Sequence, residues 1–119
     1  MNSPQFCIGT AKLGDENYGY SSDKSDRDME KFFNKCKELE IYNFDTSPRY
    51  SNSEKILGKY LSKFSNNKVF VSTKVDDLIP NSIHSKEKIK SSIDKSLSDL
   101  NLNKLDLLYL HQNSLEIIS

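Results

Sequence analysis

Four residues carry side chains suited to proton transfer at a carbonyl oxygen: Asp45, Tyr50, Lys74 and His111. Reduction of a carbonyl places negative charge on its oxygen, and a phenol can donate the proton that neutralises this charge. An ammonium such as that of Lys74 favours the phenolate form of a nearby tyrosine. A carboxylate such as that of Asp45 can keep the lysine charged, and His111 can donate a hydrogen bond to the carbonyl oxygen.

Each of these residues, taken alone, also has an ordinary structural interpretation. An aspartate that precedes Thr and Ser after a strand is often a turn former. A tyrosine near a proline usually packs, a lysine can mark the exit of a strand into water, and a histidine can close a strand. The combination is more informative than any member, because Asp45, Lys74 and His111 close three successive predicted strands and Tyr50 lies in the loop after Asp45.

The elements that must position these residues alternate along the chain. Short apolar or β-branched runs predict strands at residues 6–10, 41–45, 69–74 and 105–111. Apolar residues at helical spacing predict helices between them, at residues 26–39, 53–64 and 86–100.

This alternation predicts an α/β fold with parallel strands joined by right-handed crossovers. An open doubly wound sheet and a segment of a barrel both satisfy it. The nucleotide-binding glycine patterns of open sheets are missing, and chemistry-bearing residues follow several strands, which favours the barrel. We therefore expect residues 1–119 to form a single partial domain, an incomplete (β/α)8 TIM barrel of four strands and three helices.

Composition limits the other classes of function. The chain has 17 basic and 17 acidic side chains, which gives no electrostatic signal for nucleic acid or an anionic membrane. The two cysteines, Cys7 and Cys36, fit neither a metal site nor a disulfide framework, and we expect both to be packed, reduced thiols. No apolar stretch has the length of a membrane helix or the features of a signal peptide, so a cytoplasmic location is expected.

The motifs also resemble a known family. The segment 45–58, D-T-S-P-R-Y-S-N-S-E-K-I-L-G, resembles the D-T-A-x-x-Y-G-x-S-E-x-x-L-G segment of aldo/keto reductases. Residues 92–111, with their S-L-x-x-L core, D-L dipeptide and closing histidine, are similar to a second signature of that family. Residues 71–75 resemble the strand that carries its lysine, and residues 6–14 resemble its opening strand and turn. These segments cover nearly the whole chain.

The resemblance implies a (β/α)8 barrel that uses NADPH or NADH to reduce aldehydes, ketones or sugars. Asp45, Tyr50, Lys74 and His111 would then occupy the positions of the catalytic tetrad. Tyr50 would be the general acid, Lys74 would tune it, Asp45 would pair with the lysine, and His111 would orient the carbonyl. Gly9, Thr10 and Asp45 would lie near the nicotinamide, and no metal is implied.

Chain length sets a further expectation. A barrel of this kind needs about 250 residues, whereas this chain has 119. We expect it to be the truncated first half of the barrel, inactive alone because the family's second half makes most contacts with the dinucleotide. Open sheet edges and an inner face of Phe, Val and Leu would favour self-association.

Two other functions remain open at this point. The chain could be a non-catalytic remnant or an interaction subunit that docks through its open sheet edge. It could also be an open-sheet binding domain unrelated to reductases, although the four residues and the long motifs would then be coincidental. The small-molecule substrate and the choice between NADPH and NADH cannot be read from the sequence.

Overall fold

The computed structural model describes residues 6–13, 26–64, 68–75 and 85–110. Strands and helices alternate throughout this part of the chain, as the sequence predicts. The elements are β1 (Ile8–Gly9), α1 (Asp26–Glu38), β2 (Asn43–Asp45), α2 (Ser53–Leu61), β3 (Phe70–Val75), α3 (Ser85–Leu100) and β4 (Leu107–Leu110). Among these residues, no helix combines the length and the hydropathy needed to cross a membrane.

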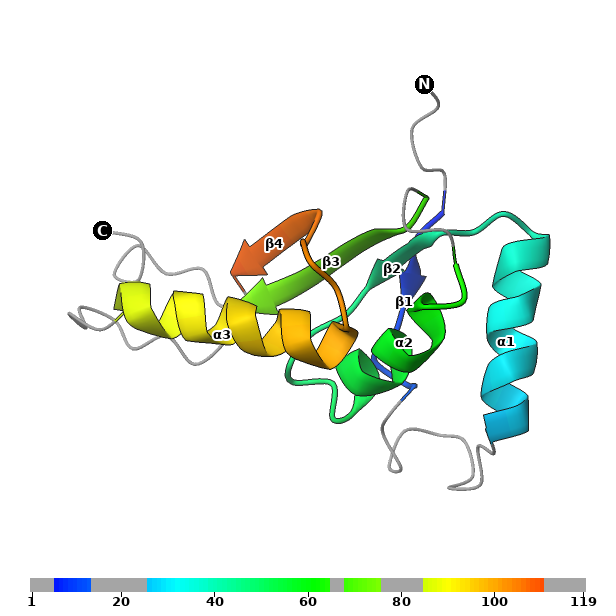
Figure 1. Ribbon diagram of the computed structural model, residues 1–119, viewed down its shortest axis with the longest axis horizontal. Helices are drawn as coiled ribbons and strands as arrows, with labels where there is room; N and C mark the ends of the chain where they lie inside the picture. Colours follow the sequence, from blue (N-terminus) through cyan, green and yellow to red (C-terminus); the bar gives the residue numbers. More distant parts are fainter. Residues whose placement is uncertain (1–5, 14–25, 65–67, 76–84, 111–119) are drawn as a thin grey trace.

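The four strands form one parallel sheet in the order β1-β2-β3-β4, so each strand lies beside the next one in the chain (Figure 1). Parallel neighbours require crossover connections, and the helices that follow the strands supply them. The predicted α/β architecture of four parallel strands alternating with three helices is therefore confirmed in the described residues. The register places Gly9, Asp45 and Ser72 side by side and pairs Lys74 with Tyr109.

The helices bury their apolar sides against one face of this sheet. Phe44 of β2 and Val71 of β3 are fully buried there, in a cluster with side chains of all three helices. The ring of Phe33 in α1 stacks on Tyr60 of α2, with 4.8 Å between the ring centroids. Such aromatic pairs stabilise a fold beyond the area that they bury. Cys36 is also buried in this cluster, as predicted.

Helices α2 and α3 approach each other closely at Gly58. A Cβ atom at this position would lie 2.7 and 2.8 Å from backbone atoms of Leu100 in α3, closer than atoms can pack. Glycine therefore allows a contact between the two helices that any other residue would obstruct. This contact anchors α3 beside α2, so that α3 also packs against β3.

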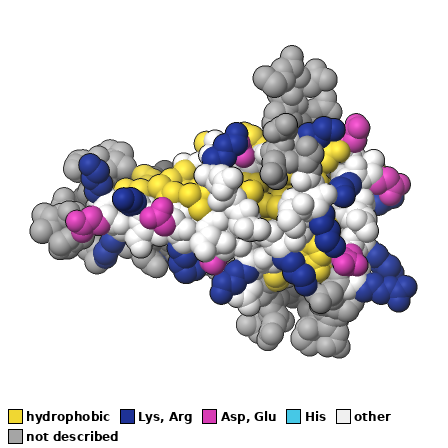
Figure 2. All heavy atoms as spheres, viewed as in Figure 1, with side chains coloured by type: hydrophobic (Ala, Val, Ile, Leu, Met, Phe, Trp, Pro, Cys, Tyr) yellow, Lys and Arg dark blue, Asp and Glu magenta, His cyan; other side chains and the backbone are white. Residues whose placement is uncertain are grey.

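The expectation that Phe, Val and Leu form the inner face is wrong for most positions of the first three strands. Phe44, Val71 and Val75 all point into the helix-covered core, with exposed fractions of 0%, 0% and 2%. Strand residues alternate between faces, so the opposite face receives the intervening residues, which include Asp45, Ser72 and, at the start of β3, Phe70. Exposed apolar residues in the sheet are found in β4, where the view in Figure 2 also shows hydrophobic side chains.

Candidate active site

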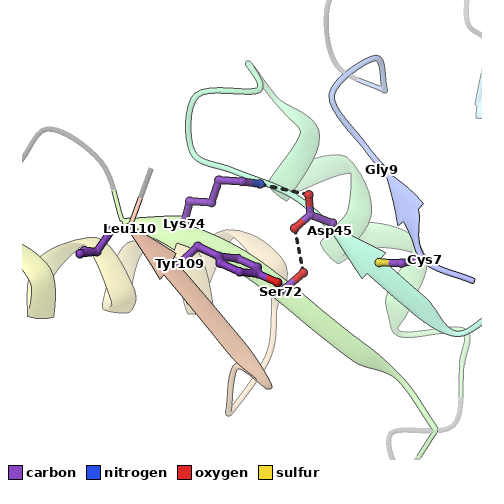
Figure 3. A pocket seen from close by; sticks show the side chains of 7 residues that line it. All are labelled: Cys7, Gly9, Asp45, Ser72, Lys74, Tyr109 and Leu110. Carbon is purple, nitrogen blue, oxygen red and sulfur yellow. Dashed lines mark hydrogen bonds and ion pairs between the residues drawn. The ribbon is translucent and has the colours of Figure 1, made fainter. Parts of the chain in front are cut away.

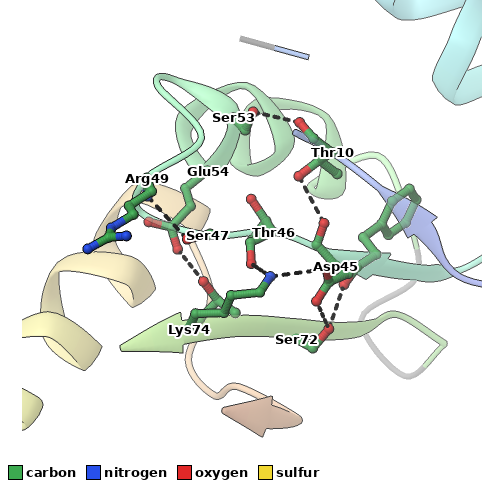
Figure 4. A network of polar contacts seen from close by, with 11 residues as sticks. Thr10, Asp45, Thr46, Ser47, Arg49, Ser53, Glu54, Ser72 and Lys74 are labelled. Atoms are coloured by element: carbon green, nitrogen blue, oxygen red, sulfur yellow. Dashed lines mark hydrogen bonds and ion pairs between the residues drawn. The ribbon is translucent and has the colours of Figure 1, made fainter. Parts of the chain in front are cut away.

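The lysine and the aspartate expected in the site meet on the inner face of the sheet. Asp45 is the last residue of β2. It pairs with Ser72 of the neighbouring β3, and Lys74 lies two residues after Ser72, on the same face. The Nζ atom of Lys74 reaches back to donate to Asp45 Oδ2 at 3.1 Å and to the carbonyl oxygen of Thr46 at 2.9 Å (Figure 4). The side chains are 16% and 33% exposed, respectively, so this ion pair is partly shielded from water.

The second oxygen of the same carboxylate is held by a residue that the sequence analysis did not identify. Ser72 Oγ donates a hydrogen bond to Asp45 Oδ1 at 2.8 Å. Ser72 lies directly opposite Asp45 in the parallel register and is 4% exposed. The alternation of β3 was the available signal, because it places Ser72 and Lys74 on the same face.

Tyr50 is brought to Lys74 by the turn between β2 and α2. The backbone N–H of Tyr50 donates to Ser47 O at 3.0 Å, and its carbonyl accepts from Ser53 N at 2.9 Å, at the start of α2. These bonds fix the turn so that the Tyr50 ring lies 4.8 Å from Lys74 Nζ, measured to the ring centroid. A cation at this distance from an aromatic ring is attracted to it.

Three of the four expected catalytic residues, Asp45, Tyr50 and Lys74, therefore lie together in the structure. His111 lies outside the described residues. The expected cofactor contacts differ in their positions. Gly9 lines the pocket beside Asp45, whereas Thr10 is fully buried and donates its hydroxyl proton to Asp45 O at 3.0 Å. A role for Thr10 beside the cofactor stays a prediction.

An open pocket of about 610 Å³ lies in front of the ion pair (Figure 3). It is lined by residues of all four strands and by Cys7, which precedes β1; the lining residues are Cys7, Gly9, Asp45, Ser72, Lys74, Tyr109 and Leu110. Gly9 has no side chain, and a Cβ atom there would meet nothing within 4 Å, so this wall leaves room for a flat ring. Tyr109 is the tyrosine among the lining residues, and sequence reasoning missed it.

Cys7 also lines this pocket, and the expectation that it is packed is wrong, because the residue is exposed. Desolvation of the thiol, followed by the negative charge of Asp45, raises the pKa of Cys7. A thiol with a raised pKa holds less of the nucleophilic thiolate near neutral pH. The inner-face position therefore makes Cys7 a wall of the pocket and a weak nucleophile.

A buried polar layer supports the site from the helix side of the sheet. Thr73, next to Lys74, donates its hydroxyl proton to Glu54 Oε2 at 2.9 Å, and Glu54 is 3% exposed. Ser53 Oγ donates to Thr10 O at 2.7 Å, which ties α2 to β1. Desolvation raises the pKa of Glu54, while hydrogen bonds from Ser96 and Thr73 oppose the shift. This layer fixes α2 against the strand ends that carry the site.

The arrangement can stabilise negative charge on oxygen. The ammonium of Lys74 lines an open pocket, is held by a carboxylate and a backbone carbonyl, and lies against the ring of Tyr50. Because these groups are in place before any reaction, they need little rearrangement when charge develops. Within the described part of the chain, no three His, Cys, Asp or Glu side chains are grouped as a metal site requires.

Comparison with known proteins gives a consistent family and fold. The sequence model of the aldo/keto reductase family matches residues 5–116. None of the curated proteins compared matches the chain. A Pseudomonas aeruginosa protein described as an aldo-keto reductase is 26% identical, with a TM-score of 0.75 over 95% of this chain and 45% of its own.

Two more distant solved structures share the fold. One, a thermostable aldo-keto reductase solved with the inhibitor epalrestat, is 20% identical, with a TM-score of 0.72 over 92% of this chain and 39% of its own. The other, an aldo-keto reductase of the silkworm Bombyx mori, is 19% identical, with a TM-score of 0.67 over 88% of this chain and 32% of its own. The chain thus spans less than half the length of each structure.

Proposed function

Because this chain belongs to the aldo/keto reductase family, we propose that it supplies the catalytic groups of an oxidoreductase that reduces the carbonyl of an aldehyde, ketone or sugar. The observation that carries this proposal is the position of Lys74 Nζ, which lies between the Asp45 carboxylate and the Tyr50 ring. The polar inner face and the open pocket beside it support the same activity.

Each residue has a definite task in this proposal. Tyr50 gives its phenolic proton to the carbonyl oxygen as negative charge develops there. Lys74 stabilises the phenolate that remains, and Asp45 keeps Lys74 charged. His111 orients the carbonyl through a hydrogen bond, as the resemblance to the family implies.

NADPH or NADH, when bound, would supply the hydride. Gly9 and Asp45 would border the nicotinamide ring, since both line the open pocket. The described residues offer few groups for the rest of a dinucleotide, because Lys74 is the one cation in the pocket lining and it is engaged by Asp45. We therefore expect weak binding of NADPH or NADH, and little activity, for the 119 residues alone.

A completed barrel tests the proposed activity directly. The 119 residues are fused to the remaining part of the Pseudomonas aeruginosa relative, and NADPH-dependent reduction of an aromatic aldehyde is followed. We expect Tyr50→Phe to lower kcat by about 100-fold or more, since general acid catalysis contributes at least that much. Tyr42→Phe is the matched control, because its ring packs against Phe64 in the core. A fused protein that binds NADPH but whose activity survives Tyr50→Phe would contradict the proposal.

One observation favours a second function, an interaction subunit without catalysis. β4 is an edge strand of the described sheet, and its Leu107, Leu108 and Tyr109 are exposed. A strand of this kind can pair with a partner chain. Saturable NADPH binding at the pocket, lost on Lys74→Met, would favour the reductase, whereas no binding by the completed barrel would favour the subunit. A cytoplasmic location is expected from the family and stays a prediction.

A further inference from the structure

We propose that Ser72 is a positioning residue, which orients the Asp45 carboxylate so that it holds Lys74 for proton transfer. This inference rests on the proposed reductase function and assigns a role within the same site. The hydrogen bonds of the Ser72 hydroxyl go to Asp45 and Phe44, and neither goes to Tyr50 or Lys74. Ser72 acts through Asp45, because the Ser72 hydroxyl donates a hydrogen bond to Asp45 Oδ1, with 2.8 Å between the two oxygen atoms.

The direction of this hydrogen bond follows from the proton count. A serine hydroxyl carries one proton, and Ser72 Oγ has two acceptors nearby: Asp45 Oδ1 at 2.8 Å and Phe44 O at 3.5 Å. The shorter contact is to a charged acceptor, and charge-assisted hydrogen bonds are the stronger kind. The hydroxyl proton of Ser72 therefore points toward Asp45 Oδ1. Because Ser72 is only 4% exposed, water competes little for this hydrogen bond.

A single neighbouring strand, β3, thus holds both oxygens of the Asp45 carboxylate. Oδ1 accepts from Ser72 and Oδ2 accepts from Lys74, and both donors belong to β3 (Figure 4). A carboxylate with both oxygens held cannot rotate about its Cβ–Cγ bond without losing a hydrogen bond. Lys74 uses a second N–H for Thr46 O at 2.9 Å, which leaves the third for the side on which Tyr50 lies.

Ser72→Ala would remove the hydrogen bond to Asp45 Oδ1 but leave the side chains of Asp45 and Lys74 present. The carboxylate could then turn toward the water of the open pocket, since Asp45 is 33% exposed. Lys74 would spend more time away from Asp45 and the Tyr50 ring. The consequence is a lysine that is more accessible and less well oriented, with the fold retained.

Chemical labelling of lysines tests this without requiring activity. The chain is treated with acetic anhydride, and the acetylation rate of each lysine is read by mass spectrometry. We expect Ser72→Ala to raise the rate at Lys74 by about 3- to 10-fold, the equivalent of one hydrogen bond, with other lysines unchanged. Ser72→Thr keeps the hydroxyl and restores the slow rate. Ser96→Ala is the matched control, a buried serine that binds Glu54 instead.

Two results would overturn the inference: an unchanged rate at Lys74 in Ser72→Ala, or a rate in Ser72→Thr as high as in Ser72→Ala. If Ser72→Ala does not fold, all lysines react faster together, and Ser72→Cys replaces it because a thiol keeps the shape but donates weakly.

The completed barrel supplies the second readout. There we expect Ser72→Ala to lower kcat with KM unchanged, because substrate contacts stay intact. Failure of the reductase proposal would remove turnover from every variant and leave the labelling result standing, so the two failures are distinguishable. Faster labelling in Ser72→Ala with an unchanged kcat in an active barrel would limit Ser72 to structure and overturn its positioning role.

Discussion

Lys74 shows how one charged residue is accommodated on the inner face of a sheet. Its Nζ atom contacts a carboxylate, a backbone carbonyl and an aromatic ring, which come from β2 and from the turn after it. Each partner replaces part of the water that the ammonium loses at 16% exposure. The position of the lysine therefore depends on Asp45 as much as on its own strand.

Replacement of Asp45 tests this dependence. Asp45→Asn keeps the size of the side chain but removes the negative charge, which leaves Lys74 partly buried without a counter-charge. We expect the free energy of unfolding to fall by about 1–2 kcal/mol, less than for a fully buried pair because water reaches both groups. Urea denaturation measures the loss. No change in stability would mean that the ion pair is fully screened by solvent.

Glu54 predicts a dependence of stability on pH. Its pKa is raised above the ordinary value of 4.5, chiefly by desolvation. The folded chain therefore binds a proton at Glu54 more readily than the unfolded chain does. As a result, stability falls as pH rises from about 4.5 to the raised pKa, and the contribution of Glu54 to stability is constant above that pKa. Below the ordinary value both states are protonated, and the contribution is likewise constant.

Glu54→Gln removes this titration and keeps the side-chain shape. We expect the stability of the wild-type chain, relative to that of Glu54→Gln, to decrease with pH over this interval in urea denaturation from about pH 4 to about pH 8. A difference between the two chains that does not vary with pH would show that Glu54 titrates alike in the folded and unfolded chains.

The sequence predicted the groups of the candidate site better than it predicted their support. Asp45 and Lys74 are recognisable because an acid and a base at successive strand ends must meet at one rim of a parallel sheet. Ser72 has no such signal, since a serine in a strand is ordinary, and Glu54 stands in the S-E pair of the 45–58 segment, which does not indicate its task. Their roles depend on register and on helix packing, which arise only when distant segments come together.

At the scale of elements, the close approach of α2 and α3 has a measurable cost when it is obstructed. Gly58→Ala would place a methyl group against the backbone of Asp99 and Leu100 in α3. We expect the free energy of unfolding to fall by about 1–3 kcal/mol, as is usual for overpacking. The shift is measured by urea denaturation.

Gly9→Ala is the matched control for this substitution, because a Cβ atom there meets nothing within 4 Å. It should change stability by less than about 0.5 kcal/mol. Equal losses in the two variants would mean that backbone flexibility, and not the helix contact, explains the effect at Gly58.

The predicted elements are confirmed in type, while several boundaries differ for identifiable reasons. β2 begins at Asn43, not at Ile41, because the backbone N–H of Ile41 donates to Cys36 O at 2.8 Å and so completes the end of α1. α2 ends at Leu61, yet Phe64 is still buried in the core at 5% exposure, which is why its apolar spacing extended the predicted helix. The spacing of apolar residues reflects which side chains are buried, whereas backbone hydrogen bonds determine where a helix or strand begins and ends.

For the whole molecule, the exposed side chains of β4 predict association between copies. Leu107, Leu108 and Tyr109 are 39%, 37% and 48% exposed, and no strand lies beyond β4 in the described sheet. We expect sedimentation velocity to show self-association that increases with concentration, because an apolar edge strand readily pairs. Leu108→Lys should weaken it, since lysine on an edge strand opposes pairing.

Leu39→Lys is the matched control for this experiment, because Leu39 is an exposed leucine, at 58%, that follows α1 and lies in no strand. Its variant should associate as the unsubstituted chain does. A chain that stays monomeric at all concentrations, or an equal effect of both substitutions, would exclude pairing through β4.

The strand order β1-β2-β3-β4 also has a consequence for how the chain folds during its synthesis. Each strand pairs with the one made just before it, so no strand must wait for a distant segment to leave the ribosome. β3 can align on β2 while α3 is still being translated, because the two paired strands are separated in the chain by one crossover helix, α2. The sheet can therefore grow in the direction of translation, one strand at a time, from β1 toward β4.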